Sequence, residues 1–168
     1  MMKMPAFLLT ILVACLPPAA RAQVPVTPNP DHESMLQSKD PQLAKNKRLV
    51  YDFWREVFEA AHMDLAPKYM AETYIQHNPR VPTGRQAFID FFSRVKKPAP
   101  IEARVKAPLV AVLADTDLVT LVFVKEETEP LDAGRKYTTT WFDMFRIVEG
   151  KIAEHWDPAV KPPAPPKQ

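Results

Sequence analysis

The first hydrophobic pattern of the folded region has helical spacing. Asp40-Pro41 provides an N-cap followed by proline at the first helical position. Apolar residues then recur every three or four positions, at Leu49, Val50, Phe53, Trp54, Val57, Phe58 and Ala61. This period predicts one amphipathic helix from Pro41 to about His62.

Two shorter helices are expected next. Residues 64–71 allow a short helix because Pro67 falls in its first turn, where proline is tolerated. Thr83 and Gln86 have the spacing of a capping box, and a phenylalanine-rich helical stripe follows as far as the Lys-Pro-Ala-Pro sequence at 97–100. The pattern therefore predicts a helix over 64–71 and another that begins after Thr83.

The second half of the folded region has the β-branched and aromatic content of strands. The expected strands are 101–106, 109–114, 118–126, 136–148 and 151–156, with turns at 115–117, 129–134 and 149–150. Helices followed by consecutive strands are typical of an α+β domain. We expect a curved antiparallel sheet that forms a cone with an apolar interior, closed by the N-terminal helices.

The N-terminal 22 residues have the pattern of an export signal. Lys3 precedes an apolar run over 6–16 that is too short to span a bilayer, and Ala20-Arg21-Ala22 is an A-x-A cleavage pattern. We predict a signal peptide over 1–22 and a periplasmic or secreted protein with no membrane span.

Cys15 offers an alternative to cleavage after Ala22. It is the only cysteine of the chain, and Leu12-Val13-Ala14-Cys15 resembles a bacterial lipobox. The alternative is therefore a lipoprotein anchored through Cys15. In either case the folded domain has no disulfide and no thiol nucleophile.

Prolines mark both ends of the domain. Residues 23–40 are polar and proline-rich, which predicts an extended linker in which His32 is solvated. Residues 159–168 form a second proline-rich tail. The folded domain is thus expected over 41–158.

Charge and glycine content exclude several functional classes. The chain has 22 Lys and Arg against 20 Asp and Glu, and Lys3 and Arg21 fall in the predicted signal peptide. The balance of the remaining chain does not favour nucleic acid as a partner. The glycines are Gly84, Gly134 and Gly150, too scattered for a phosphate-binding loop, and we expect no nucleotide cofactor.

The strongest candidate chemistry lies at the end of the last strand, His155-Trp156-Asp157. Strand alternation puts His155 and Asp157 on one face and Trp156 on the other. A carboxylate beside large apolar groups can acquire a raised pKa and act as a base, with His155 orienting it or binding a ligand oxygen. The alternative is that Asp157 caps backbone amides or pairs with an arginine.

Asp143 is a second carboxylate in apolar surroundings. By alternation it shares a face with Trp141 and Phe145. A carboxylate on an aromatic face is normally paired, so Asp143 is either a second polar group of a pocket or an ion-pair partner of a neighbouring strand. Trp141, Phe145 and Phe123 are expected in the core, where they also line the pocket.

Four short blocks of the sequence resemble a known family. They are Tyr74-Ile75-Gln76-His77-Asn78-Pro79, Pro82-Thr83-Gly84-Arg85, Phe142-Asp143-x-Phe145-Arg146 and Gly150-Lys151-Ile152-x-Glu154-His155-Trp156-Asp157. In this order they resemble the SnoaL-like polyketide cyclases of the nuclear-transport-factor-2-like superfamily, over roughly residues 43–157. The resemblance implies a cystatin-like α+β barrel.

The same resemblance implies a site. Asp157 would be the acid and base of a proton transfer next to a carbonyl, without metal or cofactor. His77 and Asn78 would lie near the pocket mouth, where His77 binds ligand or orients the acid; a turn-stabilising hydrogen bond is its alternative. Tyr74 would donate to an enolate oxygen or pack in the core.

A metal centre is a further alternative for these residues. His77, His155, Asp157 and Asp143 have the chemistry of zinc or iron ligands. No compact ligand spacing such as H-x-x-x-H is present, and the resemblance is to metal-free proteins. We therefore expect no metal.

Three functional hypotheses follow. The first is an exported isomerase, aldol-type cyclase or dehydratase that acts on a small apolar molecule with a carbonyl or hydroxyl group. The second is a non-catalytic carrier of such a ligand. The third is an interaction module, and a homodimer through the outer sheet face would be favoured by an exposed apolar stripe over 118–124.

Overall fold

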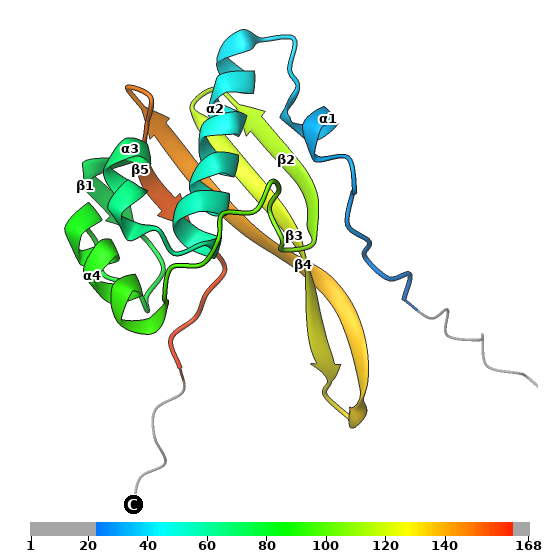
Figure 1. Ribbon diagram of the computed structural model, residues 1–168. Coiled ribbons are helices and arrows are strands. Elements are labelled where there is room, and N and C mark those ends of the chain that lie inside the picture. The colour runs from blue at the N-terminus through cyan, green and yellow to red at the C-terminus, as the bar shows by residue number, and fades with distance from the viewer. Residues whose placement is uncertain (1–22, 163–168) are drawn as a thin grey trace, which may run out of the picture.

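The computed structural model describes residues 23–162, and the predicted signal peptide lies outside them. Helices precede and follow the first strand, and four consecutive strands come last (Figure 1). The α-helices are α1 (His32–Leu36), α2 (Pro41–Phe53), α3 (Ala66–Tyr69) and α4 (Arg85–Val95). The strands are β1 (Met70–Gln76), β2 (Leu109–Asp115), β3 (Leu118–Glu129), β4 (Asp132–Val148) and β5 (Lys151–Trp156).

The α+β class is confirmed, but the sheet is mixed and open. Within the described residues the strand order is β1-β5-β4-β3-β2, with β1 parallel to β5 and the other neighbours antiparallel. The prediction of a wholly antiparallel sheet was wrong, because β1, which precedes α4 in the chain, pairs in parallel with the last strand. The β4–β5 turn has the predicted residues: Glu149 and Gly150 both have positive φ, 49° and 73°, as a tight hairpin requires.

The long helix begins as predicted but changes character before its end. Asp40 accepts hydrogen bonds from the first-turn amides of α2, and Pro41 occupies the first turn. From Trp54 to Glu59 the backbone winds into a π-helix. This widened turn is one of the local irregularities often found beside functional sites. Trp54 and Phe58 both reach the cavity described below.

Other local predictions were wrong in detail. Residues 64–71 divide into a 3₁₀ turn, Met63–Leu65, the single turn of α3, and the start of β1. Residues 101–106 form no strand. Helix α4 begins after Gly84, and the Thr83 hydroxyl bonds to the Gln76 backbone instead of closing a capping box.

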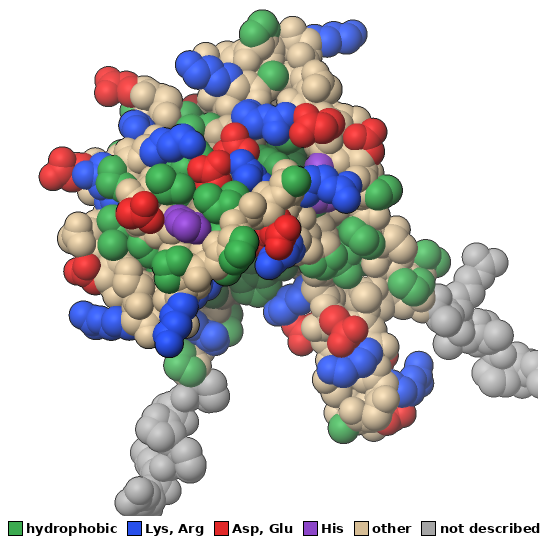
Figure 2. Space-filling model, viewed as in Figure 1, with side chains coloured by type: hydrophobic (Ala, Val, Ile, Leu, Met, Phe, Trp, Pro, Cys, Tyr) green, Lys and Arg blue, Asp and Glu red, His purple; other side chains and the backbone are tan. Residues whose placement is uncertain are grey.

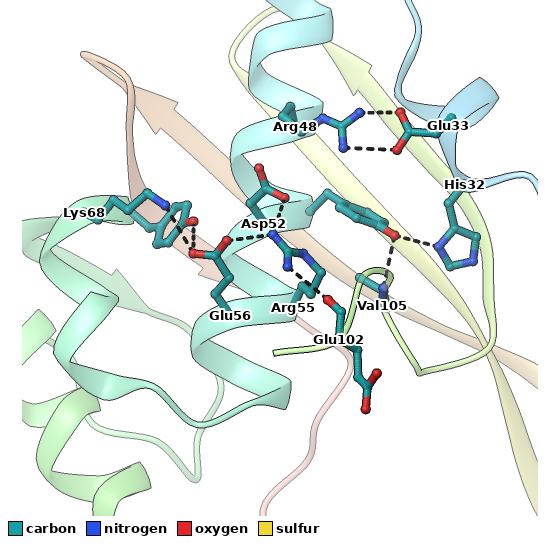
Figure 3. Close-up of polar contacts among 11 residues, drawn as sticks. His32, Glu33, Arg48, Asp52, Arg55, Glu56, Lys68, Glu102 and Val105 are labelled. Atoms are coloured by element: carbon teal, nitrogen blue, oxygen red, sulfur yellow. Dashed lines mark hydrogen bonds and ion pairs between the residues drawn. The ribbon is translucent and has the colours of Figure 1, made fainter. Parts of the chain in front are cut away.

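The segment before α2 is not simply extended. It contains α1, whose Met35 and Leu36 are buried in the core. His32 is not merely solvated: its Nδ1 lies 2.7 Å from the Tyr51 hydroxyl, and Arg48 of α2 forms a two-pronged ion pair with Glu33 (Figure 3). The proline-rich segment is therefore attached to the domain by side-chain contacts.

Charged side chains of both signs are distributed over the visible surface, and the described helices differ from membrane spans in length and hydropathy. Positive and negative side chains are interspersed over the face shown in Figure 2. No helix within residues 23–162 is long and apolar enough to cross a membrane.

Candidate functional site

A cavity of about 440 Å³ lies against the inner face of the sheet, within the usual size range of small-molecule pockets. Its walls are mostly phenylalanine and tryptophan side chains from α2, the π-helix, α4, β3 and β4. The uncharged and acidic polar groups in it are Tyr74, Gln76, Asn78, Asp143, His155 and Asp157. Few polar groups in an apolar enclosure are what fixes the orientation of a small ligand.

The structure brings most of the predicted site residues together. The cavity is lined by Asp157, His155, Tyr74, Asn78, Trp141, Asp143, Phe145 and Phe123. His77 is not among its lining residues: its Nε2 lies 3.0 Å from Glu154 Oε1, and its ring stacks on Trp156 with centroids 4.9 Å apart. Its alternation with Gln76 explains this, because neighbouring residues of a strand face opposite sides.

The end of β1 carries two side-chain amides of fixed orientation. The Asn78 backbone amide donates to Gln76 Oε1 at 2.9 Å, and the Arg80 backbone amide donates to Asn78 Oδ1 at 2.9 Å. A backbone N–H can only donate, so each contacted atom is the oxygen of its amide. The NH₂ group of each side chain is consequently directed at another partner.

Gln76 connects the two sides of the site. Its Oε1 also lies 2.7 Å from His155 Nδ1, and its Nε2 donates to the Tyr74 hydroxyl at 2.9 Å. Because Gln76 Oε1 is an acceptor, His155 must carry a proton on Nδ1. The Tyr74 oxygen accepts in this contact, which leaves its own O–H proton for another partner. Gln76 was missed from the sequence, although its alternation with Tyr74 and Asn78 was a sufficient signal.

Asp143 and His155 form a buried pair across β4 and β5. His155 Nε2 lies 3.0 Å from Asp143 Oδ1, and the two residues are only 6% and 5% exposed. Both sequence alternatives for Asp143 are thus present, since it lines the cavity and pairs with a neighbouring strand. Burial raises the pKa of Asp143, and the negative charge of Asp157 acts in the same direction, against the hydrogen bond from His155.

This pair leaves one oxygen unused. With the Nδ1 proton directed at Gln76, a single proton between Nε2 and Oδ1 satisfies the pair, as a neutral acid with imidazole or as an ion pair. Asp143 Oδ2 is buried and has no hydrogen-bond partner among the described residues. A buried polar atom without a partner costs about 1–3 kcal/mol, and a ligand hydroxyl would remove that cost.

Asp157 is held by neutral donors. Its Oδ2 accepts from Asn78 Nδ2 at 2.6 Å, and its Oδ1 accepts from the Ala159 amide at 2.9 Å. It therefore lines the cavity and also caps a backbone amide. His155 does not orient it, because the imidazole is occupied by Gln76 and Asp143.

Tyr74 lies beside both carboxylates. It is 2% exposed, and burial together with the charges of Asp157 and Asp143 raises its pKa well above the usual value. The phenol consequently keeps its proton at neutral pH and can act as a hydrogen-bond donor.

Asp143, His155 and Asp157 are also the described residues that could approach a metal ion together, with candidate ligand atoms all within 4.8 Å of one another. Both oxygens of Asp157 already accept hydrogen bonds, and one shared proton serves the other two residues. Among the carboxylate oxygens of this group, Asp143 Oδ2 alone has no hydrogen-bond partner in the described residues.

Three solved structures that are similar to this chain share only 14% to 18% sequence identity with it. No curated protein matches the chain. Among solved structures, a polyketide-cyclase-like protein of Acidithiobacillus ferrooxidans is similar at 18% identity and a TM-score of 0.48, over 72% of this chain and 89% of that one. A SnoaL-like protein of Jannaschia sp. CCS1 is similar at 14% identity and a TM-score of 0.48, over 73% and 91%. TsrD from Streptomyces laurentii is similar at 17% identity and a TM-score of 0.45, over 71% and 90%.

The sequence itself identifies the family. The pattern described as SnoaL-like polyketide cyclase matches residues 48–159, which include β1 to β5 and every polar residue of the cavity. The chain belongs to the SnoaL-like polyketide cyclase family.

Proposed function

We propose that this protein is an exported enzyme that transfers a proton next to the carbonyl of a small apolar molecule, as in isomerisation, aldol-type ring closure or dehydration. The observation that carries the proposal is the convergence of a carboxylate, a phenol donor and an unpaired buried carboxyl oxygen in one aromatic cavity. A carboxylate and a hydrogen-bond donor are what an enolisation requires.

The roles follow from the protons that each group holds. The Asp157 carboxylate removes the proton α to the carbonyl, and its carboxylic acid returns the proton to the product carbon or to a leaving hydroxyl. The Tyr74 hydroxyl donates to the oxygen on which enolate charge develops. Asp143 Oδ2 accepts from a hydroxyl of the ligand, and His155 and Gln76 hold that carboxyl group in place.

Proton abstraction can be tested before the natural substrate is known. The probe is 2-tetralone, an apolar bicyclic ketone, and the measurement is deuterium incorporation at its α-carbon in D₂O by NMR. Asp157→Asn should lower the enzyme-dependent rate by at least about 100-fold, because the amide cannot take the proton. The matched control is Asp115→Asn, at an exposed position at the end of β2, which should exchange at the wild-type rate.

The same assay assigns the remaining candidates. Tyr74→Phe should slow exchange by about 10-fold or more through loss of the donor. His77→Gln should leave the rate unchanged, because the imidazole contacts Glu154 and Trp156 outside the cavity. Binding of 2-tetralone without exchange in the wild-type protein would contradict the enzyme and favour a carrier.

Export and assembly are part of the proposal. An exposed apolar stripe over 118–124, which would have favoured a homodimer, is not present, since those residues are buried or half-buried. Exposed apolar side chains of the sheet are instead Ile75, Leu113, Phe142 and Val148, and we propose that a homodimer would use them. Native mass spectrometry of protein from the host envelope would separate cleavage after Ala22 from lipidation at Cys15, and monomer from dimer.

A further inference from the structure

We propose that the ligand of this cavity carries an acidic group, a carboxylate or sulfonate, which Arg80 and Lys125 bind while the apolar body fills the aromatic interior. The inference rests on the proposed function, because it adds a head group to the same ligand. Both cationic side chains belong to the lining of a cavity whose surface is otherwise mainly aromatic.

Arg80 is held in position without using its whole hydrogen-bonding capacity. The Asn78 side chain accepts from the Arg80 amide, and the Val81 amide donates to the Asn78 carbonyl, so residues 78–81 form a tight turn. The Arg80 Nε donates to the Val160 carbonyl at 2.8 Å. Its two terminal nitrogens make no hydrogen bond or ion pair with another described residue, which leaves a planar pair of donors suited to a two-oxygen anion.

Lys125 brings a second positive charge from a different element. It lies on β3, in the same inward alternation as Phe123, and its Nζ lies 4.4 Å from the centroid of the Trp141 ring. Glu127 contacts the same Nζ at 2.6 Å, with both side chains about 40% exposed. An ion pair that is this solvated is weak and can be exchanged for a ligand anion at little cost.

The cavity lining includes two cationic side chains beside its acidic groups. Arg80 and Lys125 carry full positive charges. Of the acidic groups, Asp143 is paired with His155, and the Asp157 carboxylate keeps its charge while it accepts from Asn78. A neutral apolar ketone would use the aromatic walls and the polar network but leave both cations without a partner in the ligand. An apolar acid would use all three parts of the cavity.

Two dyes with one skeleton isolate this contribution. The probe 1-anilinonaphthalene-8-sulfonate is an apolar aromatic anion, and N-phenyl-1-naphthylamine is the same skeleton without the sulfonate. Fluorescence titrations of the wild-type protein should give tighter binding of the sulfonate, and added salt should weaken only that dye. Arg80→Gln and Lys125→Gln should each weaken the sulfonate by about fivefold and leave the neutral dye unchanged.

The control is Arg94→Gln, which removes a positive charge from α4 outside the cavity lining and should affect neither dye. Equal affinity for the two dyes, equal weakening of both by the variants, or failure of both to bind would overturn the inference. Dye binding needs no proton transfer, so these results are independent of the 2-tetralone exchange that tests the proposed function.

Discussion

Two histidines of this protein belong to hydrogen-bond chains that begin at a backbone amide, and the two chains differ in what lies at the far end. At His155 the chain runs from the Asn78 amide through Gln76, and it continues to Asp143, whose second oxygen has no partner. At His32 it runs from the Val105 amide through the Tyr51 hydroxyl and ends at the ring (Figure 3).

The two relay residues offer their histidines different groups. Gln76 offers an oxygen, so His155 Nδ1 must donate. The Tyr51 oxygen accepts from Val105, and the Tyr51 hydroxyl has its own proton to donate, which His32 Nδ1 accepts when the ring is protonated on Nε2. The His32 chain ends at a partly exposed ring and attaches the N-terminal segment to α2. The His155 chain stops at Asp143 Oδ2, a buried oxygen in the cavity that has no partner among the described residues. We call this atom the open end of the chain; a purely structural network would not need such an unpaired group.

Among the changes that test this contrast, the largest effect is expected from removing Gln76, the relay residue of the His155 chain. Gln76→Met keeps the volume but leaves the Asn78 amide, the His155 Nδ1 proton and the Tyr74 hydroxyl without their partner. We expect 2-tetralone exchange to fall by about 10- to 100-fold, and the free energy of unfolding to fall by about 1–3 kcal/mol in urea denaturation.

A structural role alone would lower stability and leave the pH dependence of the remaining activity unchanged. If Gln76 positions the imidazole, the pH profile of exchange should shift in Gln76→Met, because the protonated nitrogen of His155 is no longer fixed. An unshifted profile would reduce Gln76 to a packing residue.

The matched change is Tyr51→Phe in the His32 chain, whose closed end is the His32 ring. It leaves the buried Val105 amide and His32 Nδ1 unpaired while the ring, 1% exposed, keeps its packing. Unfolding free energy should fall by about 1–3 kcal/mol, with 2-tetralone exchange per folded molecule unchanged. Loss of exchange in this variant would show that the two regions are coupled.

Much of this contrast could be derived from sequence patterns, and the remainder required pairing across the fold. Alternation predicted that His155 and Asp157 share a face and that Asp143 needs a partner. Alternation also indicated that Gln76, and not His77, shares a face with Tyr74. The histidine was chosen because of the resemblance of its sequence block to the family. The Asp143–His155 pair depends on the β4–β5 register, in which Phe145 is opposite His155, and no local pattern supplies that register.

The N-terminal segment was misjudged for a related reason. Proline content predicts an extended backbone, yet the attachment of Met35 and Leu36 depends on the surface offered by α2 and β2. The position of β1 beside β5 is likewise a long-range pairing.

The third prediction concerns pH at the open end. Burial raises the pKa of Asp143 above its unfolded value, so the stabilisation from its protonated form is present at low pH and is lost as pH rises through the folded pKa. Asp143→Asn resembles the protonated acid at every pH. The unfolding free energy of the wild type minus that of Asp143→Asn should therefore decrease as pH increases, by less than the loss in Tyr51→Phe. A pH-independent difference would contradict this assignment.

The smallest effect is expected at the closed end and has the opposite sign. Burial and the nearby Arg104 lower the pKa of His32, against the charges of Glu33, Glu59 and Asp31. A histidine with a lowered pKa stabilises the fold above its unfolded pKa, and that stability is lost as pH falls through the folded value. Acid should therefore loosen residues 31–36 by under about 1 kcal/mol, since the ring is partly solvated.

Amide hydrogen exchange over 31–36 at pH 7.5 and pH 5.5, corrected for intrinsic rates, measures this loosening. His32→Gln should remove the pH dependence, because its amide group can accept from Tyr51 at both pH values. If acid loosens this segment equally in the variant, His32 does not carry the pH response. The Arg48–Glu33 ion pair should stay charged at both pH values, because the hydrogen bond from Arg48 lowers the pKa of Glu33. The comparison therefore separates an uncharged relay at Tyr51 from a solvated ion pair, two attachments of one segment that respond differently to pH.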